Sequence, residues 1–224
     1  MLILAVHSST PVLGVACVQD SRVLKELELP PGRQHLENLA RLIADLTRSL
    51  KIELADLHGF GVAVGPGSFS GIRIGLATVK GMAIALGKPV AGVSCLDILA
   101  WQVLEEADTG TAMIDAKRGE VYAASYEKVS GKIVLLDGPA LIGRERLSEL
   151  MERSHATVAI AGDVEKIPEN SIPIRVARPS AAVCGLMACE RLKQGDADET
   201  HSLHPLYIRR SDAEEKNKQR KGLA

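Results

Sequence analysis

The residues best suited to chemistry stand where two apolar stretches of the sequence give way to polar turns. His7, Ser8 and Ser9 follow the apolar run at 2–6, and Asp115 follows the apolar residues 112–114. A histidine at such a place is a candidate ligand or base, and an aspartate there is either a functional carboxylate or a turn former. These four residues are the candidates for binding a cofactor.

A glycine-rich stretch, GPGSFSGIRIG at 65–75, joins an expected strand to an expected helix. It matches neither the Walker phosphate loop nor the dinucleotide fingerprint, because Ser70 stands where each of these motifs requires glycine. Two alternatives remain open. The amides of residues 68–71 form a general anion site, or the stretch is a turn that lets the strand pass into the helix.

The helix expected at 72–86 is apolar or small on more than one side. Ile72, Leu76, Val79 and Ala83 recur at helical spacing, while the remaining surface is rich in glycine and alanine. Small residues allow close approach of a neighbouring element. We therefore expect one face to pack on a sheet and another to meet either the helix at 36–50 or a second subunit.

Motifs for known catalytic and metal centres are missing from the sequence. It contains no G-x-S-x-G, H-E-x-x-H or helical H-x-x-x-H pattern, and its four cysteines form no C-x-x-C pair. Pro205 follows His201 and His204 and argues against a helical metal pair there. The sequence predicts no catalytic residue and no metal site, and the cysteines are expected to be small buried hydrophobes in a reducing compartment.

Composition limits the class of protein. The 224 residues are 46% hydrophobic and 3% aromatic and carry a net charge of -1. Such a chain can bury a substantial aliphatic core but lacks the electrostatic footprint of a protein that binds nucleic acids or membranes directly. No leader pattern or apolar run of membrane length is found, so a cytoplasmic protein with no membrane partner is expected.

Hydrophobic periodicity predicts an α/β protein built from two similar halves. Each half opens with three strands and two short turns, the first at 2–27 and the second from 111 onward, and His7 aligns with Asp115. The other expected elements are helices at 35–50, 72–86, 94–106, 144–153 and 180–194, and strands at 59–65, 90–93, 158–162 and 174–177. The predicted division is an N-terminal lobe at 1–106, a C-terminal lobe at 107–210 and a disordered charged tail at 211–224.

Three segments together resemble the TsaB (YeaZ) family: ILAVHSSTPVLGVAC, GVAVGPGSFSGIRIGLATVKGMAIALGKPVAGVSCLDILA and MIDAKRGEVYAASY. The resemblance implies the actin-like ATPase (ribonuclease H-like) fold, with two duplicated lobes that each open with a three-stranded β-meander. It also implies a non-catalytic scaffold that activates a TsaD-like enzyme, for N6-threonylcarbamoylation of adenosine 37 in tRNAs that read ANN codons. The alternative is an actin-fold ATPase or glycoprotease-like peptidase that acts alone.

Further expectations follow from this resemblance. The partners would be a TsaD-like catalytic subunit, a TsaE-like ATPase and, through the complex, tRNA, with a homodimer when the chain is alone. No cofactor is expected beyond weak ATP or ADP binding, and His7 stands where the family usually has aspartate, which weakens the case for nucleotide hydrolysis. The family's partner surface maps onto the two N-lobe helices, at Leu39, Ile43, Gly71, Ile72, Gly75, Leu76, Val79, Lys80 and Ala83.

Overall fold

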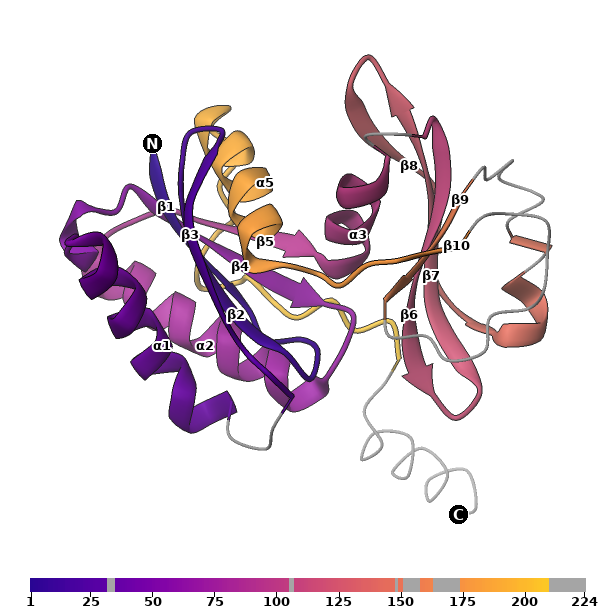
Figure 1. The fold of residues 1–224 in the computed structure, drawn as a ribbon, viewed down its shortest axis with the longest axis horizontal. Helices are drawn as coiled ribbons and strands as arrows, with labels where there is room; N and C mark the ends of the chain where they lie inside the picture. Colours follow the sequence, from indigo (N-terminus) through magenta and orange to yellow (C-terminus); the bar gives the residue numbers. More distant parts are fainter. Residues whose placement is uncertain (32–34, 105–106, 148, 151–157, 163–173, 210–224) are drawn as a thin grey trace.

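The computed structural model describes residues 1–31, 35–104, 107–147, 149–150, 158–162 and 174–209. Two five-stranded sheets form the frame, and helices lie outside the first sheet and between the two (Figure 1). The predicted tail at 211–224 lies outside the described residues, as do residues 148 and 151–153 of the helix predicted at 144–153. That segment begins with a short 3₁₀ turn, η2 (Arg144–Arg146).

The first sheet has the strand order β3-β2-β1-β4-β5. Its strands are β1 (Leu2–His7), β2 (Leu13–Gln19), β3 (Arg22–Leu29), β4 (Gly59–Gly65) and β5 (Val90–Ser94). β1 is antiparallel to β2 and parallel to β4, so it is central and is buried on both faces. This explains why β1 is a continuous apolar run without polar alternation.

The second sheet repeats this arrangement with the order β8-β7-β6-β9-β10. Its strands are β6 (Thr109–Lys117), β7 (Glu120–Val129), β8 (Lys132–Gly143), β9 (Val158–Gly162) and β10 (Ile174–Val176). β6 is antiparallel to β7 and parallel to β9, as β1 is to β2 and β4. The predicted duplication and the α/β, actin-like fold class are confirmed, with His7 and Asp115 near the ends of equivalent central strands.

Two helices cover the outer face of the first sheet, α1 (His35–Leu50) and α2 (Phe69–Leu86) (Figure 1). α1 has its predicted limits, and the 3₁₀ turn η1 (Leu54–Asp56) follows it. α2 begins three residues before the prediction because the Ser68 side chain accepts a hydrogen bond from the Gly71 N–H and caps the helix. α2 is long and apolar enough to span a membrane by length and composition alone, and six of its residues are buried within the protein.

Two further helices are exchanged between the lobes. α3 (Cys95–Val103) follows the first sheet in the chain but packs against β6 to β9 of the second sheet. α5 (Ala181–Lys193) follows the second sheet but packs across β1, β2 and β4 of the first. Small residues let α5 approach closely, since a Cβ on Gly61 would lie 2.8 Å from the Ala188 Cβ.

Because of this exchange, the predicted boundary at residue 107 separates α3 and α5 from the sheets on which they mainly pack. The cut assigns α3 to the first lobe and α5 to the second, whereas each packs mainly on the other lobe's sheet. The apolar residues of β1 show why: Leu4 and Val6 belong to the core under α1 and α2, while Ile3 and Ala5 belong to the core between the sheets. The inner face of the first sheet is therefore buried only after the end of the chain has folded back.

A fragment comprising residues 1–106 tests this consequence. Without α5, the inner face of β1 and β4 would be exposed, and burial of a large apolar side chain contributes about 1.5–3 kcal/mol. We expect the fragment to show no cooperative thermal transition by circular dichroism, whereas the full chain melts cooperatively. A sharp transition in the isolated fragment would contradict the exchange as a requirement for folding.

Candidate functional site

The turn between β1 and β2 is buried, with exposed fractions of at most 6% for residues 7–10. The Ser8 Oγ donates a hydrogen bond of 2.8 Å to the Gly71 carbonyl. The Ser68 N–H donates one of 2.7 Å to the Ser9 carbonyl. The turn is thus held against the N-terminal end of α2, and these polar groups bond within the protein.

Glycines at every fourth position make this contact possible. A Cβ on Gly67 would lie closer than 3.0 Å to the Ser9 carbonyl oxygen, and one on Gly71 or Gly75 would lie that close to Ser8. Carbon–oxygen contacts this short are strongly repulsive. The glycine-rich stretch therefore packs against a turn of its own chain, and Gly71 and Gly75, predicted to meet a partner, are covered by that turn.

The alternative of an anion site at the amides of 68–71 has little support in this arrangement. The Ser68 N–H is bonded to the Ser9 carbonyl, and the Gly71 N–H donates to the Ser68 Oγ at 3.3 Å. The stretch acts as a turn that leads β4 into α2 and anchors the β1–β2 turn.

His7, Ser9 and Cys95 form a chain of polar side chains in this region. The Ser9 Oγ lies 2.8 Å from the His7 Nε2 and 2.8 Å from the Cys95 Sγ. Such groups can supply a nucleophile and a base. Here, however, all three side chains are buried, and burial raises the pKa of the Cys95 thiol to about 11. The thiol is neutral at pH 7, and the three residues join the β1–β2 turn to the start of α3.

Asp115 occupies the equivalent place in the second lobe, and its side chain is 10% exposed. The Lys117 Nζ donates a hydrogen bond of 2.7 Å to one carboxylate oxygen, and the Lys117 N–H donates one of 3.0 Å to the other. Asp115 therefore stabilises the tight β6–β7 turn, as the turn-former alternative predicts. Within the described part of the chain, no three His, Cys, Asp or Glu side chains form a cluster that could hold a metal ion.

The N-terminal end of α5, where an anion could bind, is occupied by a carboxylate of the chain itself. The Glu26 Oε1 accepts a hydrogen bond of 2.9 Å from the Ala182 N–H, and the Ser180 Oγ accepts one of 3.1 Å from the Val183 N–H. Negative charge is favourable at a helix N-terminus, but burial raises the pKa of Glu26. The first-sheet strand β3 is linked to α5 in this way.

Residues 196–209 form a segment that we call the C-terminal strap. The Lys80 Nζ on α2 donates hydrogen bonds of 3.0 and 3.1 Å to two strap carbonyls, and the Leu206 N–H donates one of 2.8 Å to the Val64 carbonyl. At its end, Arg209 forms an ion pair with Glu120 of β7. The strap therefore links the first lobe to the β6–β7 hairpin, and Lys80, predicted to contact a partner, holds the strap.

The remaining predicted interface residues lie in the core of the first lobe. Each is at most 5% exposed and faces the sheet or the other helix: Leu39, Ile43, Ile72, Leu76, Val79 and Ala83. The structure corrects the prediction for these residues, because the apolar stripe of each helix is its core face. Periodicity locates a buried stripe but does not say which neighbour covers it.

The exposed face of α2 lies on the other side of the helix. It includes Ala77, Gly81 and Ile84, the last 53% exposed. The small residues Ala77 and Gly81 leave the helix backbone accessible from outside. This face, and not the core stripe, is the part of α2 that can meet another molecule.

Aromatic residues extend this face at the start of α2. The rings of Phe69 and Tyr207 stack with centroids 5.0 Å apart. The Arg73 guanidinium lies 3.8 Å above the Phe69 ring, and its Nε donates a hydrogen bond of 2.7 Å to the Tyr207 Oη. Local sequence patterns do not predict this cluster, because Tyr207 is remote from Phe69 and Arg73 in sequence. The available signal was the scarcity of aromatic residues, with two phenylalanines and three tyrosines in the chain.

The chain was compared with known families, proteins and structures. Residues 30–170 match the family model described as TsaD, tRNA N6-adenosine threonylcarbamoyltransferase. The tRNA threonylcarbamoyladenosine biosynthesis protein TsaB of Escherichia coli is 29% identical, over 93% of this chain and 95% of that protein. YeaZ from Pseudomonas aeruginosa has a TM-score of 0.80 and 28% identity, covering 92% of this chain and 99% of that one.

A more distant structure is similar in fold alone. The ROK hexokinase from Thermus thermophilus has a TM-score of 0.51 and 12% identity, with 87% of this chain and 100% of that chain covered. This similarity supports the two-lobed fold and no statement about activity.

Glycine substitutions on α2 test the packing of the β1–β2 turn. Gly71→Ala should lower the free energy of unfolding by about 1–3 kcal/mol, because the new methyl group overlaps a backbone carbonyl. Gly81→Ala is the matched control, since a Cβ there has no neighbour within 4 Å; it should raise stability by about 0.5–1 kcal/mol. Urea denaturation of both variants measures the difference, and equal effects of the two substitutions would refute the packing argument.

Thiol reactivity tests the chemical state of the cysteines. All four are buried, and burial raises the pKa of each thiol. Because the thiolate is the reactive form, a raised pKa makes each cysteine less reactive at neutral pH. We expect slow reaction with a thiol reagent in the native state and fast reaction of all four after denaturation. Rapid native labelling of Cys95 would show that the chain of polar groups is accessible.

Proposed function

The chain belongs to the TsaB (YeaZ) family, within the wider family described by the TsaD model, and we propose that it acts in tRNA threonylcarbamoyladenosine biosynthesis as a non-catalytic subunit. In this role it binds and activates a TsaD-like enzyme that modifies adenosine 37 of tRNA. The observation that carries the proposal, together with family membership, is that the polar groups of the β1–β2 turn are hydrogen-bonded within the protein.

The non-catalytic part of the proposal is supported by how the candidate residues are used. In an actin-fold ATPase, a carboxylate at the end of the first strand would help to hold the metal–phosphate complex. This chain has His7 there, buried and bonded to Ser9. Asp115 is bonded to its own hairpin. Among these groups none is presented to a substrate.

The scaffold part is supported by the outer face of α1 and α2, which lie side by side (Figure 1). Ala40 and Ala44 of α1 are exposed, as are Ala77 and Gly81 of α2. Flat surfaces of small residues allow a partner helix to approach closely. Arg73 and Tyr207, which lie beside Phe69, are of the residue types that dominate binding energy in protein interfaces.

Several partners follow from the proposal. A TsaD-like catalytic subunit would occupy the outer face of α1 and α2, a TsaE-like ATPase would join the larger complex, and tRNA would be reached through the complex. In isolation, two copies of the chain would pair through the same face and form a homodimer. The proposal requires no cofactor held by this chain alone and places it in the cytoplasm.

Substitutions on the exposed face of α2 test the surface. Gly81→Arg introduces a long charged side chain where close approach is needed, without touching the core. We expect it to weaken association with the TsaD homologue of the same organism by at least about tenfold, as measured by light scattering and calorimetry. Ala197→Arg, at an exposed position away from this face, should bind as the unmodified chain does.

Three results would decide against the proposal. If the unmodified chain forms no complex with the TsaD homologue at micromolar concentration, even with ATP, the scaffold role fails. If the pure chain hydrolyses ATP with steady turnover that Asp115→Ala abolishes, the alternative of an independent ATPase is favoured. Cleavage of a glycoprotein by the pure chain would favour the peptidase alternative.

A further inference from the structure

The exposed side of α2 begins with a positive charge. Arg73, Ala77, Gly81 and Ile84 are exposed and lie three or four residues apart, so they form one row along the helix. The helix sequence contains no acidic residue, and its cations are Arg73 and Lys80. The Lys80 Nζ is already bonded to carbonyls of the C-terminal strap. A molecule that covers this row therefore meets the Arg73 guanidinium.

The Arg73 guanidinium is held in one place by two aromatic residues. Its Cζ lies 3.8 Å above the centre of the Phe69 ring, within the range of a cation–π contact. Its Nε donates a hydrogen bond of 2.7 Å to the Tyr207 Oη, and the Tyr207 ring stacks on Phe69. A side chain fixed in this way loses little conformational freedom when it forms a further contact.

Tyr207 is itself fixed, because the strap is bonded on both sides of it. The Leu206 N–H donates a hydrogen bond of 2.8 Å to the Val64 carbonyl of β4. The Arg209 Nη1 donates one of 2.6 Å to the Ala116 carbonyl of β6. The tyrosine hydroxyl is therefore presented to α2 by a segment that is anchored on both lobes.

The terminal nitrogens of Arg73 remain available for a further bond. A guanidinium carries N–H groups on Nε, Nη1 and Nη2, and within the described part of the chain only the Nε group is hydrogen-bonded. Nη1 and Nη2 lie in one plane and can bind both oxygens of a carboxylate. A partner that covered Arg73 without supplying an anion would bury an unpaired charge, which is strongly unfavourable.

We propose that Arg73 binds a carboxylate side chain of the TsaD-like subunit end-on, through Nη1 and Nη2, and that Tyr207 is the residue that positions it. Charge complementarity carries this choice of partner group, because α2 offers a cation and no acid of its own. The inference rests on the proposed function and adds to it the chemistry and the place of one contact.

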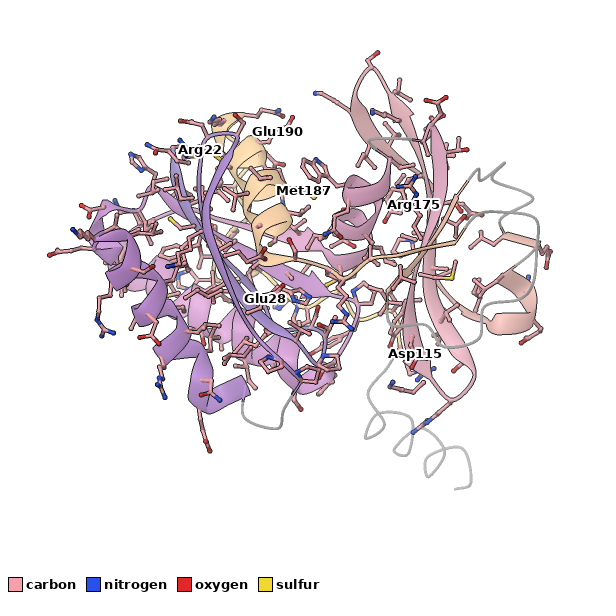
Figure 2. The ribbon with its side chains drawn as sticks, viewed as in Figure 1. Arg22, Glu28, Asp115, Arg175, Met187 and Glu190 are labelled. Atoms are coloured by element: carbon pink, nitrogen blue, oxygen red, sulfur yellow. The ribbon has the colours of Figure 1, made fainter. Side chains whose placement is uncertain are left out.

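The affinity of the full chain for the TsaD homologue, measured by calorimetry, tests this contact. Arg73→Gln should weaken binding about tenfold. Arg22→Gln is the matched control, because Arg22 is also exposed and lies at the upper end of the first lobe, whereas α2 begins near the lower end (Figure 2). The control should bind as the unmodified chain does.

The outcomes separate this inference from the proposed function. If the unmodified chain binds and Arg73→Gln binds as tightly as Arg22→Gln, the contact is refuted while the scaffold role stands. If the unmodified chain forms no complex, the scaffold role fails and the contact falls with it. A thermal melt of each variant shows that the fold is retained.

Tyr207→Phe tests the positioning role, because it removes the hydroxyl group and keeps the stacked ring. In the otherwise unmodified chain it should weaken binding about threefold, since Arg73 loses the acceptor that holds its Nε. In the Arg73→Gln background it should have no further effect, because the hydroxyl acts through Arg73. The same loss of affinity in both backgrounds would contradict this role.

Arg73→Lys identifies the group that is bound. A carbodiimide joins an amine to a carboxylate in contact with it, so a cross-link at position 73 to an acidic residue of the TsaD homologue, located by mass spectrometry, is expected. A link to the acidic residues between 212 and 215 of the same chain, or to a second copy of the chain, would overturn the choice of partner. So would the absence of any link at this position in a complex that still forms.

Discussion

The contact between the β1–β2 turn and α2 leaves no room for a methyl group at Gly71, and much of the first lobe depends on that closeness. Two hydrogen bonds hold the turn. The Ser8 Oγ donates to the Gly71 carbonyl of the helix, and the Ser68 N–H donates to the Ser9 carbonyl. With the turn in this position, its polar groups form hydrogen bonds with the N-terminal end of α2. The same contact sets the start of α2, and hence the position of Phe69 and Arg73 on the exposed face.

The exchanged helices give the two lobes a shared core. α3 and α5 lie between the sheets, and residues from both sheets and both helices form one apolar cluster. The C-terminal strap adds a second connection, from Lys80 on α2 to the hairpin residue Glu120. The two lobes are thus joined both by the exchanged helices and by the strap.

Several features could be predicted from the sequence because they depend on local physics. The three-stranded openings of both halves, the helix His35–Leu50 and the equivalence of His7 and Asp115 follow from hydrophobic periodicity and turn residues. The motif GPGSFSGIRIG was recognised as unusual, and the resemblance that it carries is confirmed by the family comparison. The helices expected at 94–106 and 180–194 also form, and Ser94 and Ser180 cap their N-termini.

What covers each surface was decided by the tertiary structure. The sequence by itself determined that α2 has an apolar stripe and a glycine face. It did not determine that Leu76 lies on the sheet and that Gly71 lies under a turn of the same chain. Nor could it assign α5 to the first sheet or bring Tyr207 to Phe69. The physical reason is that periodicity records whether a residue is buried, whereas the identity of its neighbour depends on contacts between segments far apart in the chain.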